Sequence, residues 1–382
     1  MKLAVPRLEF APRRGLLALA GLGAAAFAGG LALDPARAWV SYLVALVYAT
    51  GLGLGAAFFL ASQYVCGAGW SVALRRIPEA MTAILLPAIA GVALLALGLA
   101  TLHAPVADDA FGATATAVRL LVCFALWWFL ARRLARNSLA QDADGEVVHT
   151  RRSVRDSVLL ALLGVWSFCL ASVDLFMSLQ GHWSSTVFGL LLLAGVFLSS
   201  IAALALFVTS FRRRGWTQVF TDAHVRDLGR LLLAFSVFWV YLWVSQHLLI
   251  WYGGLPEETS YYVHRHAGSW GMLSTANVLL NWLVPFLLLL SRAGRQSDRC
   301  VRLAALSILV GHWLDLFLVA APPVLPGEPH IGWIELLPVV GATAFFVWMA
   351  LRTLARHHVV PIRDPYLVES LPALAVEPGH TH

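Results

Sequence analysis

The sequence predicts an all-α integral membrane protein with about ten transmembrane helices. Hydrophobic residues make up 59% of its 382 positions and charged residues 13%, whereas a soluble domain carries roughly 25% charged residues. The mean hydropathy is +0.76. Ten apolar runs are long enough to cross about 30 Å of hydrocarbon, and they follow one another along nearly the whole chain. These three observations predict a chain that is embedded in a membrane over most of its length.

Each membrane helix is predicted from one apolar run, and no segment between the runs is long enough to fold as a separate soluble domain. The first run follows Arg13-Arg14, and because no clear cleavage site comes after it, we interpret it as a helix rather than a secretory signal. The second run carries Gly51, Gly53 and Gly55, which provide a small-residue face for close helix packing. In chain order the runs are 15–33, 39–62, 82–102, 116–134, 157–179, 183–208, 228–252, 270–291, 301–321 and 332–354.

The basic residues predict the orientation of these helices. Of the 27 Lys and Arg, all but Arg37, Arg119 and Arg265 lie on one side, in the two tails, the adjoining helix ends and the loops 63–81, 135–156, 209–227 and 292–300. Positive residues collect on the cytoplasmic side of membrane proteins. The sequence therefore predicts a cytoplasmic N-terminal tail, a single polytopic membrane domain and a cytoplasmic C-terminal tail, with the respective bounds 1–14, 15–354 and 355–382.

Composition also argues against several classes of function. The net charge of +6 does not predict nucleic-acid binding, because the arginines lie in short loops rather than on one basic face. The four cysteines are scattered singly without a CxxC motif, so neither an iron–sulfur cluster nor a covalently bound haem is expected. A haem held by His247 and His312 is disfavoured, because di-haem cytochromes need more intramembrane histidines. We expect no metal site and no covalently bound cofactor.

Polar residues inside the apolar runs are the candidate functional residues, because ionisable groups in hydrocarbon cost several kcal/mol unless they face protein or water. The direction of each helix places these residues in the outer half of the membrane. The inner half is expected to hold few ionisable groups beyond the arginines at its rim. The outer groups are Asp174 on the fifth run, Asn277 and Asn281 on the eighth, His312 and Asp315 on one face of the ninth, and Glu335 on the tenth.

The segment 241–259, YLWVSQHLLIWYGGLPEET, adds polar groups close to the predicted outer surface. Gln246 and His247 precede a glycine break, and Glu257 and Glu258 follow it. A quinone site needs hydrogen-bond partners for two oxygens and a base for protons, and a histidine with a carboxylate can supply both. Because the polar groups lie in one half of the membrane, they favour such a site over a complete proton path. The structural alternative, pairing between helices or solvation of a turn, stays open for each residue.

Three stretches of the sequence resemble one family. They are ASVDLFMSLQGHWSSTVFG at 171–189, the segment 241–259 with Ser269-Trp270 beyond it, and GHWLDLFLVAAP at 311–322, followed by PIRDPYLVESL at 361–371. This pattern resembles ActF, the second quinone-binding-type membrane subunit of alternative complex III, a bacterial quinol:electron-acceptor oxidoreductase. That family is similar in turn to the NrfD-like membrane subunits of polysulfide reductases. The similarity runs in order over most of the second to tenth helices.

The resemblance implies an architecture and a set of partners. The architecture is two four-helix bundles with two flanking helices, in the bacterial cytoplasmic (inner) membrane. The partners are a multihaem cytochrome c subunit, an iron–sulfur subunit, a homologous quinone-binding membrane subunit and small anchor subunits.

Together with the polar residues, the resemblance leads to the hypothesis of a subunit that contacts quinone, transfers protons at the periplasmic side, or does both. Proton transfer is assigned to Asp174, His312 and Asp315. Quinone contact is assigned to His247, Gln246, Glu257, Glu258, Asn277 and His182. Two alternatives stay open: a structural anchor without an active site of its own, and a secondary transporter, which would show inverted repeats with helices broken near the midplane.

Overall fold

The computed structural model describes residues 14–103, 112–181, 183–325 and 327–371, and these residues form helices and connections without a strand. Ten of the helical spans are long and apolar enough to cross a membrane, which confirms the predicted number of membrane helices. The spans, in chain order, are α1 (Arg14–Leu33), α2 (Pro35–Val65), α3 with α4 (Arg76–Leu95), α6 (Ala113–Asp144), α7 with α8 (Val147–Gln180), α9 (Phe188–Arg212), α10 (Asp222–Gly253), α12 with α13 (Gly268–Leu289), α15 (Asp298–Val324) and α16 (Trp333–Leu354).

Three of these spans consist of two α-helices joined by a tighter or wider turn. Their component helices are α3 (Arg76–Met81), α4 (Leu85–Leu95), α7 (Val147–Leu159), α8 (Val165–Leu175), α12 (Gly268–Val278) and α13 (Val284–Leu289). Four short helices lie between or after the spans: α5 (Leu99–Leu102), α11 (Pro256–His266), α14 (Arg292–Gln296) and α17 (Leu367–Ser370).

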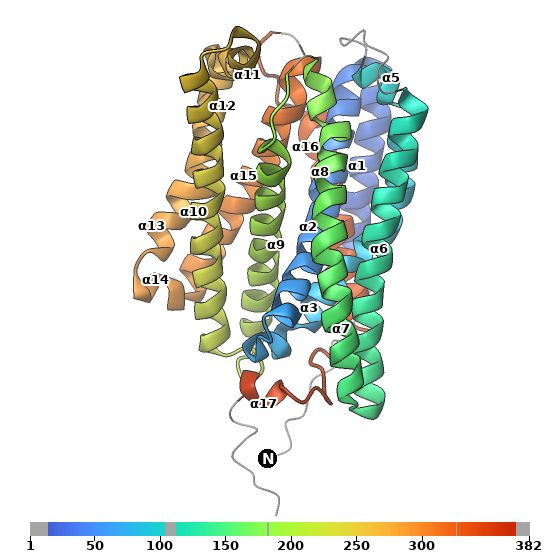
Figure 1. Ribbon diagram of the computed structural model, residues 1–382, viewed down its shortest axis with the longest axis vertical. Coiled ribbons are helices and arrows are strands. Elements are labelled where there is room, and N and C mark those ends of the chain that lie inside the picture. The colour runs from blue at the N-terminus through green and yellow to red at the C-terminus, as the bar shows by residue number, and fades with distance from the viewer. Residues whose placement is uncertain (1–13, 104–111, 182, 326, 372–382) are drawn as a thin grey trace, which may run out of the picture.

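The spans pack in two groups, with one further pair beside them. In the first group α2, α4, α6 and α7–α8 contact one another, and in the second α9, α10, α12–α13 and α15 do so. Helices α2, α9 and α15 hold the groups together, and α1 packs against α16 along the side of α2 (Figure 1). At the crossing of α1 and α16 a Cβ on Gly23 would lie 2.7 Å from Gly341 Cα, so the two backbones touch and only glycine fits there.

The short helices α11 and α17 lie at opposite ends of the long axis of the molecule (Figure 1). We call these two ends the α11 end and the α17 end. The three arginines that the sequence separates from the rest, Arg37, Arg119 and Arg265, all lie toward the α11 end. Each is engaged by other residues, with Arg37 Nε donating to Glu335 Oε1 at 2.8 Å.

Several segments that the sequence leaves as loops are helical. The segment 135–156 is not a loop: α6 continues to Asp144, and α7 begins at Val147. Gly145 makes the short connection possible because its φ of +77° is left-handed, a conformation that favours glycine. Likewise, most of 253–269 forms α11. Hydropathy misses these pieces because they are amphipathic or polar extensions of the helix bundle.

A buried charged cluster lies toward the α17 end of the molecule. Arg76 donates to Glu79 Oε2 at 2.6 Å and also pairs with Asp142. Asp156 is 1% exposed and accepts from Arg133. These acidic residues lie outside the apolar runs but inside longer helices, which explains why the hydropathy pattern overlooks them.

The described part of the C-terminal tail packs against the same end of the bundle. Asp364 forms an ion pair with Arg75, and both side chains are buried. Ser370 Oγ lies 3.0 Å from His224 Nε2 and donates to the backbone oxygen of Trp70 at 2.6 Å. The tail up to residue 371 therefore holds the loop before α3 against the start of α10.

Candidate functional site

A chain of hydrogen bonds between two helices ends on the Asp315 carboxylate. Asn281 Nδ2 donates to Asn277 Oδ1 at 2.6 Å, and Asn277 Nδ2 donates to Asp315 Oδ1 at 2.8 Å. All three side chains are buried. Asn281 lies in a π-helical turn, Leu279–Leu283, and Pro285 has no N–H to donate to the Asn281 carbonyl, which favours the wider turn.

His312 lies one turn before Asp315 on α15, and neither ring nitrogen has a hydrogen-bond partner among the described residues. Asp315 Oδ2 likewise accepts no hydrogen bond of ordinary geometry, and the Trp239 indole N–H, which has no other acceptor, lies beside this carboxylate. Gly195 of α9 packs directly on the pair, since a Cβ there would lie 3.2 Å from His312 Nδ1 and 3.5 Å from Asp315 Oδ2. Buried polar atoms are normally hydrogen-bonded, and here three buried atoms without such a partner lie within one turn of α15.

Asp315 and Asn277 line a narrow cavity between α9, α10, α11, α12 and α15, with a volume of about 40 Å³. Phe188, Leu191, Leu192 and Leu318 form part of its apolar wall. The polar part of the wall combines residues from four helices: Gln246, Tyr261, Tyr262, Arg265, His266, Ser274, Asn277 and Asp315. The cavity therefore offers an apolar surface together with hydrogen-bond donors and hydrogen-bond acceptors.

Arg265 enters this wall because two prolines leave backbone carbonyls without their usual donors. In α15 the carbonyls of Leu318 and Val319 would accept from the residues four positions on, which are Pro322 and Pro323 and have no N–H. Arg265 Nε donates to Leu318 O at 2.9 Å, and its Nη2 donates to Val319 O at 3.2 Å. The guanidinium thus replaces the missing donor of the Leu318 carbonyl and shares the Val319 carbonyl with Gln180 Nε2, which donates to it at 3.2 Å.

The Arg265 side chain is also held by aromatic rings. Its Cζ lies 3.6 Å from the centre of the Tyr261 ring, which in turn stacks on Trp183 at 4.0 Å. Burial lowers the pKa of the Arg265 guanidinium below its usual value, and the Tyr261 and Tyr262 phenols oppose this shift. An arginine pKa starts above 12, so the group remains positively charged.

Gln246 connects this cavity with a second one that reaches the α11 end. The second cavity has a volume of about 510 Å³, and its wall includes Ser184, Ser185, Gln246 and Glu258. Gln246 lines both cavities, and its Oε1 has no hydrogen-bond partner among the described residues. Polar groups therefore follow one another from Glu258 past Gln246 to Asp315.

His247, a predicted quinone-binding residue, lies behind the cavity wall rather than in it. Its ring stacks on Trp243 at 5.6 Å and on His266 at 5.2 Å, and Tyr262 meets it edge-on at 4.6 Å. Trp243, His266 and Tyr262 all line the cavity. Burial lowers the pKa of His266, and the neighbouring His247 and Arg265 lower it further.

Asp174 faces away from both cavities and forms an ion pair with α6. Arg119 Nε donates to Asp174 Oδ2 at 2.9 Å, and Arg119 Nη2 donates to Oδ1 at 2.8 Å. Glu257 is exposed in the first turn of α11 and lines neither cavity. His182 lies outside the described residues. Of the predicted site residues, the structure thus brings Gln246, Asn277 and Asp315 together, with Glu258 and His312 adjacent.

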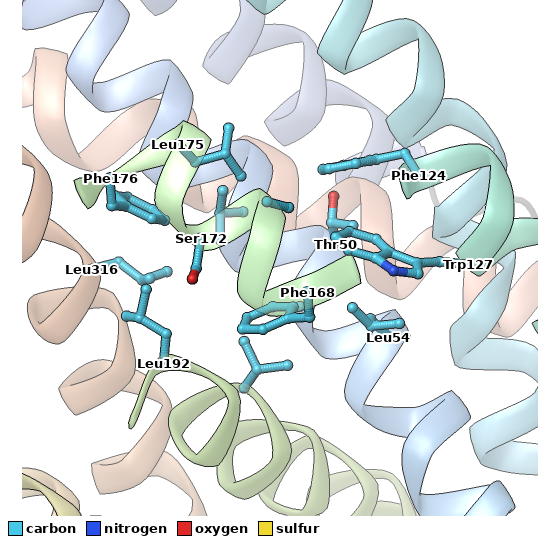
Figure 2. A pocket seen from close by; sticks show the side chains of 14 residues that line it. Thr50, Leu54, Phe124, Trp127, Phe168, Ser172, Leu175, Phe176, Leu192 and Leu316 are labelled. Atoms are coloured by element: carbon cyan, nitrogen blue, oxygen red, sulfur yellow. The ribbon is translucent and has the colours of Figure 1, made fainter. Parts of the chain in front are cut away.

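A small apolar cavity of about 20 Å³ lies between the two helix groups (Figure 2). Phe168 lies between Leu192 and Leu316 on one side and Trp127 on the other. None of its lining residues is ionisable. Leu192 lines this cavity and also the one that contains Asp315. Leu192 of α9 therefore separates the apolar cavity from the polar cavity that contains Asp315.

Sequence reasoning misses Arg265, Tyr261, Tyr262 and His266 as site residues, because the segment 253–269 is expected to be a loop. A usable signal exists in the sequence: consecutive prolines at the end of a membrane helix leave two carbonyls without donors, and a solitary arginine on the same side can satisfy them. Comparison with known proteins finds no matching family model and no matching curated protein.

Proposed function

We propose that the chain is a membrane subunit of a quinol:electron-acceptor oxidoreductase of the alternative complex III type, which contacts quinone and releases protons at the α11 end. The observation that carries the proposal is the narrow cavity lined by Asp315, Asn277, Gln246 and Arg265, together with the larger cavity of about 510 Å³ that Gln246 also lines. It combines a buried carboxylate, donor side chains and an apolar wall. An amphiphilic ring with oxygen on both sides requires this combination.

The proposed chemistry uses Asp315 as the proton acceptor. Asn277 binds Oδ1 of its carboxylate, so Oδ2 remains to accept the proton of a quinol hydroxyl. Gln246 and Glu258 continue the polar path to the α11 end. Electrons would pass to the redox groups of partner subunits, namely a multihaem cytochrome c subunit and an iron–sulfur subunit. A homologous quinone-binding subunit and small anchor subunits complete the proposed assembly.

The distribution of charge supports proton release to the outside. The α11 end holds the three arginines that the sequence separates from the other 24 basic residues, so the positive-inside rule assigns this end to the periplasm of a bacterial inner membrane and both termini to the cytoplasm. The two groups of four spans beside the α1–α16 pair agree with the bundles expected from the resemblance.

An apolar layer separates the cavity from the charged cluster at the α17 end. On α15 no ionisable residue lies between Arg302 and His312, a rise of about 15 Å at 1.5 Å per residue. On α2 the buried residues from Gly51 to Ala61 are all apolar. These helices therefore support proton release toward the α11 end rather than conduction through the whole membrane.

The test compares Asp315→Asn with Asp174→Asn in the purified complex, measuring quinol:acceptor turnover and proton release. Both carboxylates are buried in the α11 half, but only Asp315 faces the cavity. We expect Asp315→Asn to lose turnover while the partner subunits still co-purify, and Asp174→Asn to keep it. Full turnover of an assembled Asp315→Asn complex would contradict the proposal.

The alternative function, a structural anchor, is favoured by one observation. The buried carboxylates of Asp174 and Glu335 are each paired with an arginine from another helix, as expected for groups that fix helix positions. If the chain is an anchor, deleting it should abolish assembly of the complex. No single substitution in the cavity should then change turnover.

A further inference from the structure

Arg265 differs from the other two arginines of the α11 end in the groups that surround it. Arg37 and Arg119 form ion pairs with Glu335 and Asp174. Arg265 is only 5% exposed, and no carboxylate lies within ion-pair distance of it among the described residues. Its guanidinium donates hydrogen bonds to three backbone carbonyls. Carbonyl dipoles solvate the positive charge but do not neutralise it.

The Arg265 charge, which no described carboxylate contacts, faces the cavity that contains Asp315. Three of the five guanidinium N–H groups are directed to the carbonyls of Leu318, Val319 and Tyr261. Leu318 and Val319 follow Asp315 by three and four residues, so the guanidinium is attached about one helical turn, roughly 5 Å, farther along α15. The Arg265 donor and the Asp315 acceptor therefore lie at two places along the wall of one cavity.

We propose that Arg265 is the residue that binds one oxygen of the ligand in this cavity, opposite Asp315, and that it selects a ligand whose oxygen is an acceptor or carries negative charge. The inference rests on the proposed function, since it names a quinone or quinol ring as the ligand. Arginine only donates hydrogen bonds, whereas an ionised carboxylate only accepts them. The cavity is therefore polarised from a donor at the α11 side to an acceptor at Asp315.

The polarity gives the ligand one orientation. A quinol hydroxyl donates to Asp315 Oδ2, and the second oxygen accepts from the Arg265 guanidinium. The guanidinium is held in place by the carbonyls of α15 and by the Tyr261 ring, so it needs no rearrangement to meet this oxygen. A ring that lacks the second oxygen would leave the buried cation without an acceptor and should bind poorly.

The structural role of Arg265 can be separated from its role toward a ligand. Pro322→Ala and Pro323→Ala would restore the N–H groups that the Leu318 and Val319 carbonyls lack. In that background Arg265→Met removes the charge while the helix itself satisfies both carbonyls. The triple variant Arg265→Met/Pro322→Ala/Pro323→Ala therefore tests the charge without leaving those two backbone groups unpaired.

The experiment titrates the purified complex with a short-chain quinone and follows quenching of tryptophan fluorescence, since Trp243 lines the cavity. We expect the proline double variant to bind like the natural protein. We expect the triple variant to bind at least about tenfold more weakly, the loss typical of one hydrogen bond to a charged group. Thermal unfolding of the two variants should coincide.

Two controls make the result decisive. Arg265→Lys in the same double-proline background keeps a positive charge and should recover part of the binding. Arg37→Met/Glu335→Met removes an ion pair at the same end, away from the cavity, and should leave binding unchanged.

The outcomes separate the role of Arg265 from the proposed function. Equal binding by the triple variant and the natural protein would overturn the role of Arg265 while leaving the proposed function intact. That role is also overturned if the Lys variant binds as weakly as the Met variant. If the natural complex binds no quinone, the proposed function fails as well.

Discussion

Replacing Arg119 by Gln removes one half of an ion pair whose other half, Asp174, has a side chain only 3% exposed. Breaking a buried pair from one side costs about 3–5 kcal/mol, because the remaining charge stays buried without a partner. The Arg119 side chain is 31% exposed, so solvent screens part of the pair. We therefore expect a loss near the lower limit, about 3 kcal/mol of unfolding free energy.

The reverse substitution should cost less. Asp174→Asn removes the buried charge and leaves an arginine that can still reach solvent, so we expect a loss of about 1 kcal/mol, the value of an ordinary hydrogen bond. The double variant Arg119→Gln/Asp174→Asn carries two neutral amides that can bond to each other, and it should resemble Asp174→Asn. The coupling energy between the two positions is then about 3 kcal/mol.

The assay is reversible denaturant unfolding of the purified protein in detergent for the natural chain, both single variants and the double variant. Quinol turnover of the assembled complex is measured for the same four proteins. A loss below about 1 kcal/mol for Arg119→Gln would show that the pair behaves like an exposed one, and the structural assignment of Asp174 would be wrong. If the double variant is stable but has no turnover, Asp174 takes part in proton transfer, as the sequence predicts.

Three further substitutions test other parts of the structure. Gly23→Ala places a Cβ 2.7 Å from Gly341 Cα and should separate α1 from α16, lowering the unfolding free energy by about 1–3 kcal/mol in thermal or denaturant unfolding; unchanged stability would refute the contact. Gln246→Leu removes the polar group shared by the two cavities and should slow proton release while assembly and unfolding stay unchanged. Asp364→Asn breaks the buried pair with Arg75, so limited proteolysis should cut the C-terminal segment faster than in the natural chain; equal rates would contradict this.

The membrane helices are predictable from sequence because hydropathy responds to the same physical quantity that places a helix in a bilayer. The apolar runs can be assigned from length and composition without considering any contact between helices. The helix ends are not predictable in this way. Helix α6 continues to Asp144 through residues that are polar, because its extension packs on α7 rather than on lipid. Hydropathy carries no information about such a contact.

The sequence predicts how deep in the membrane the candidate site residues lie, but it does not predict which way their side chains point. Counting residues from the helix ends places Asp315, Asn277 and Asp174 in the same half of the membrane. Helices that are apolar on every side give no pattern for which face a single polar residue occupies. Asp174 consequently belongs to an ion pair with α6, whereas Asp315 faces the cavity. Arg265 counts toward the predicted orientation, but its position depends on two prolines in another helix.

The buried carboxylates of the α11 half, Asp174, Glu335 and Asp315, differ in how completely they are hydrogen-bonded. The pairs Arg119–Asp174 and Arg37–Glu335 are bidentate, so each carboxylate oxygen has a donor. Asp315 Oδ2, by contrast, accepts no hydrogen bond of ordinary geometry from the described residues. An unsatisfied buried group costs about 1–3 kcal/mol, and a helix contact gains nothing from keeping one.

A ligand that binds these groups would offset that cost, so natural sequences retain such groups where binding requires them. His312 and Gln246 add further atoms without described partners beside Asp315, and Arg265 adds a charge whose hydrogen bonds go to neutral carbonyls. The unsatisfied atoms come from α10 and α15, and the cation comes from α11. All of them lie in or beside one cavity.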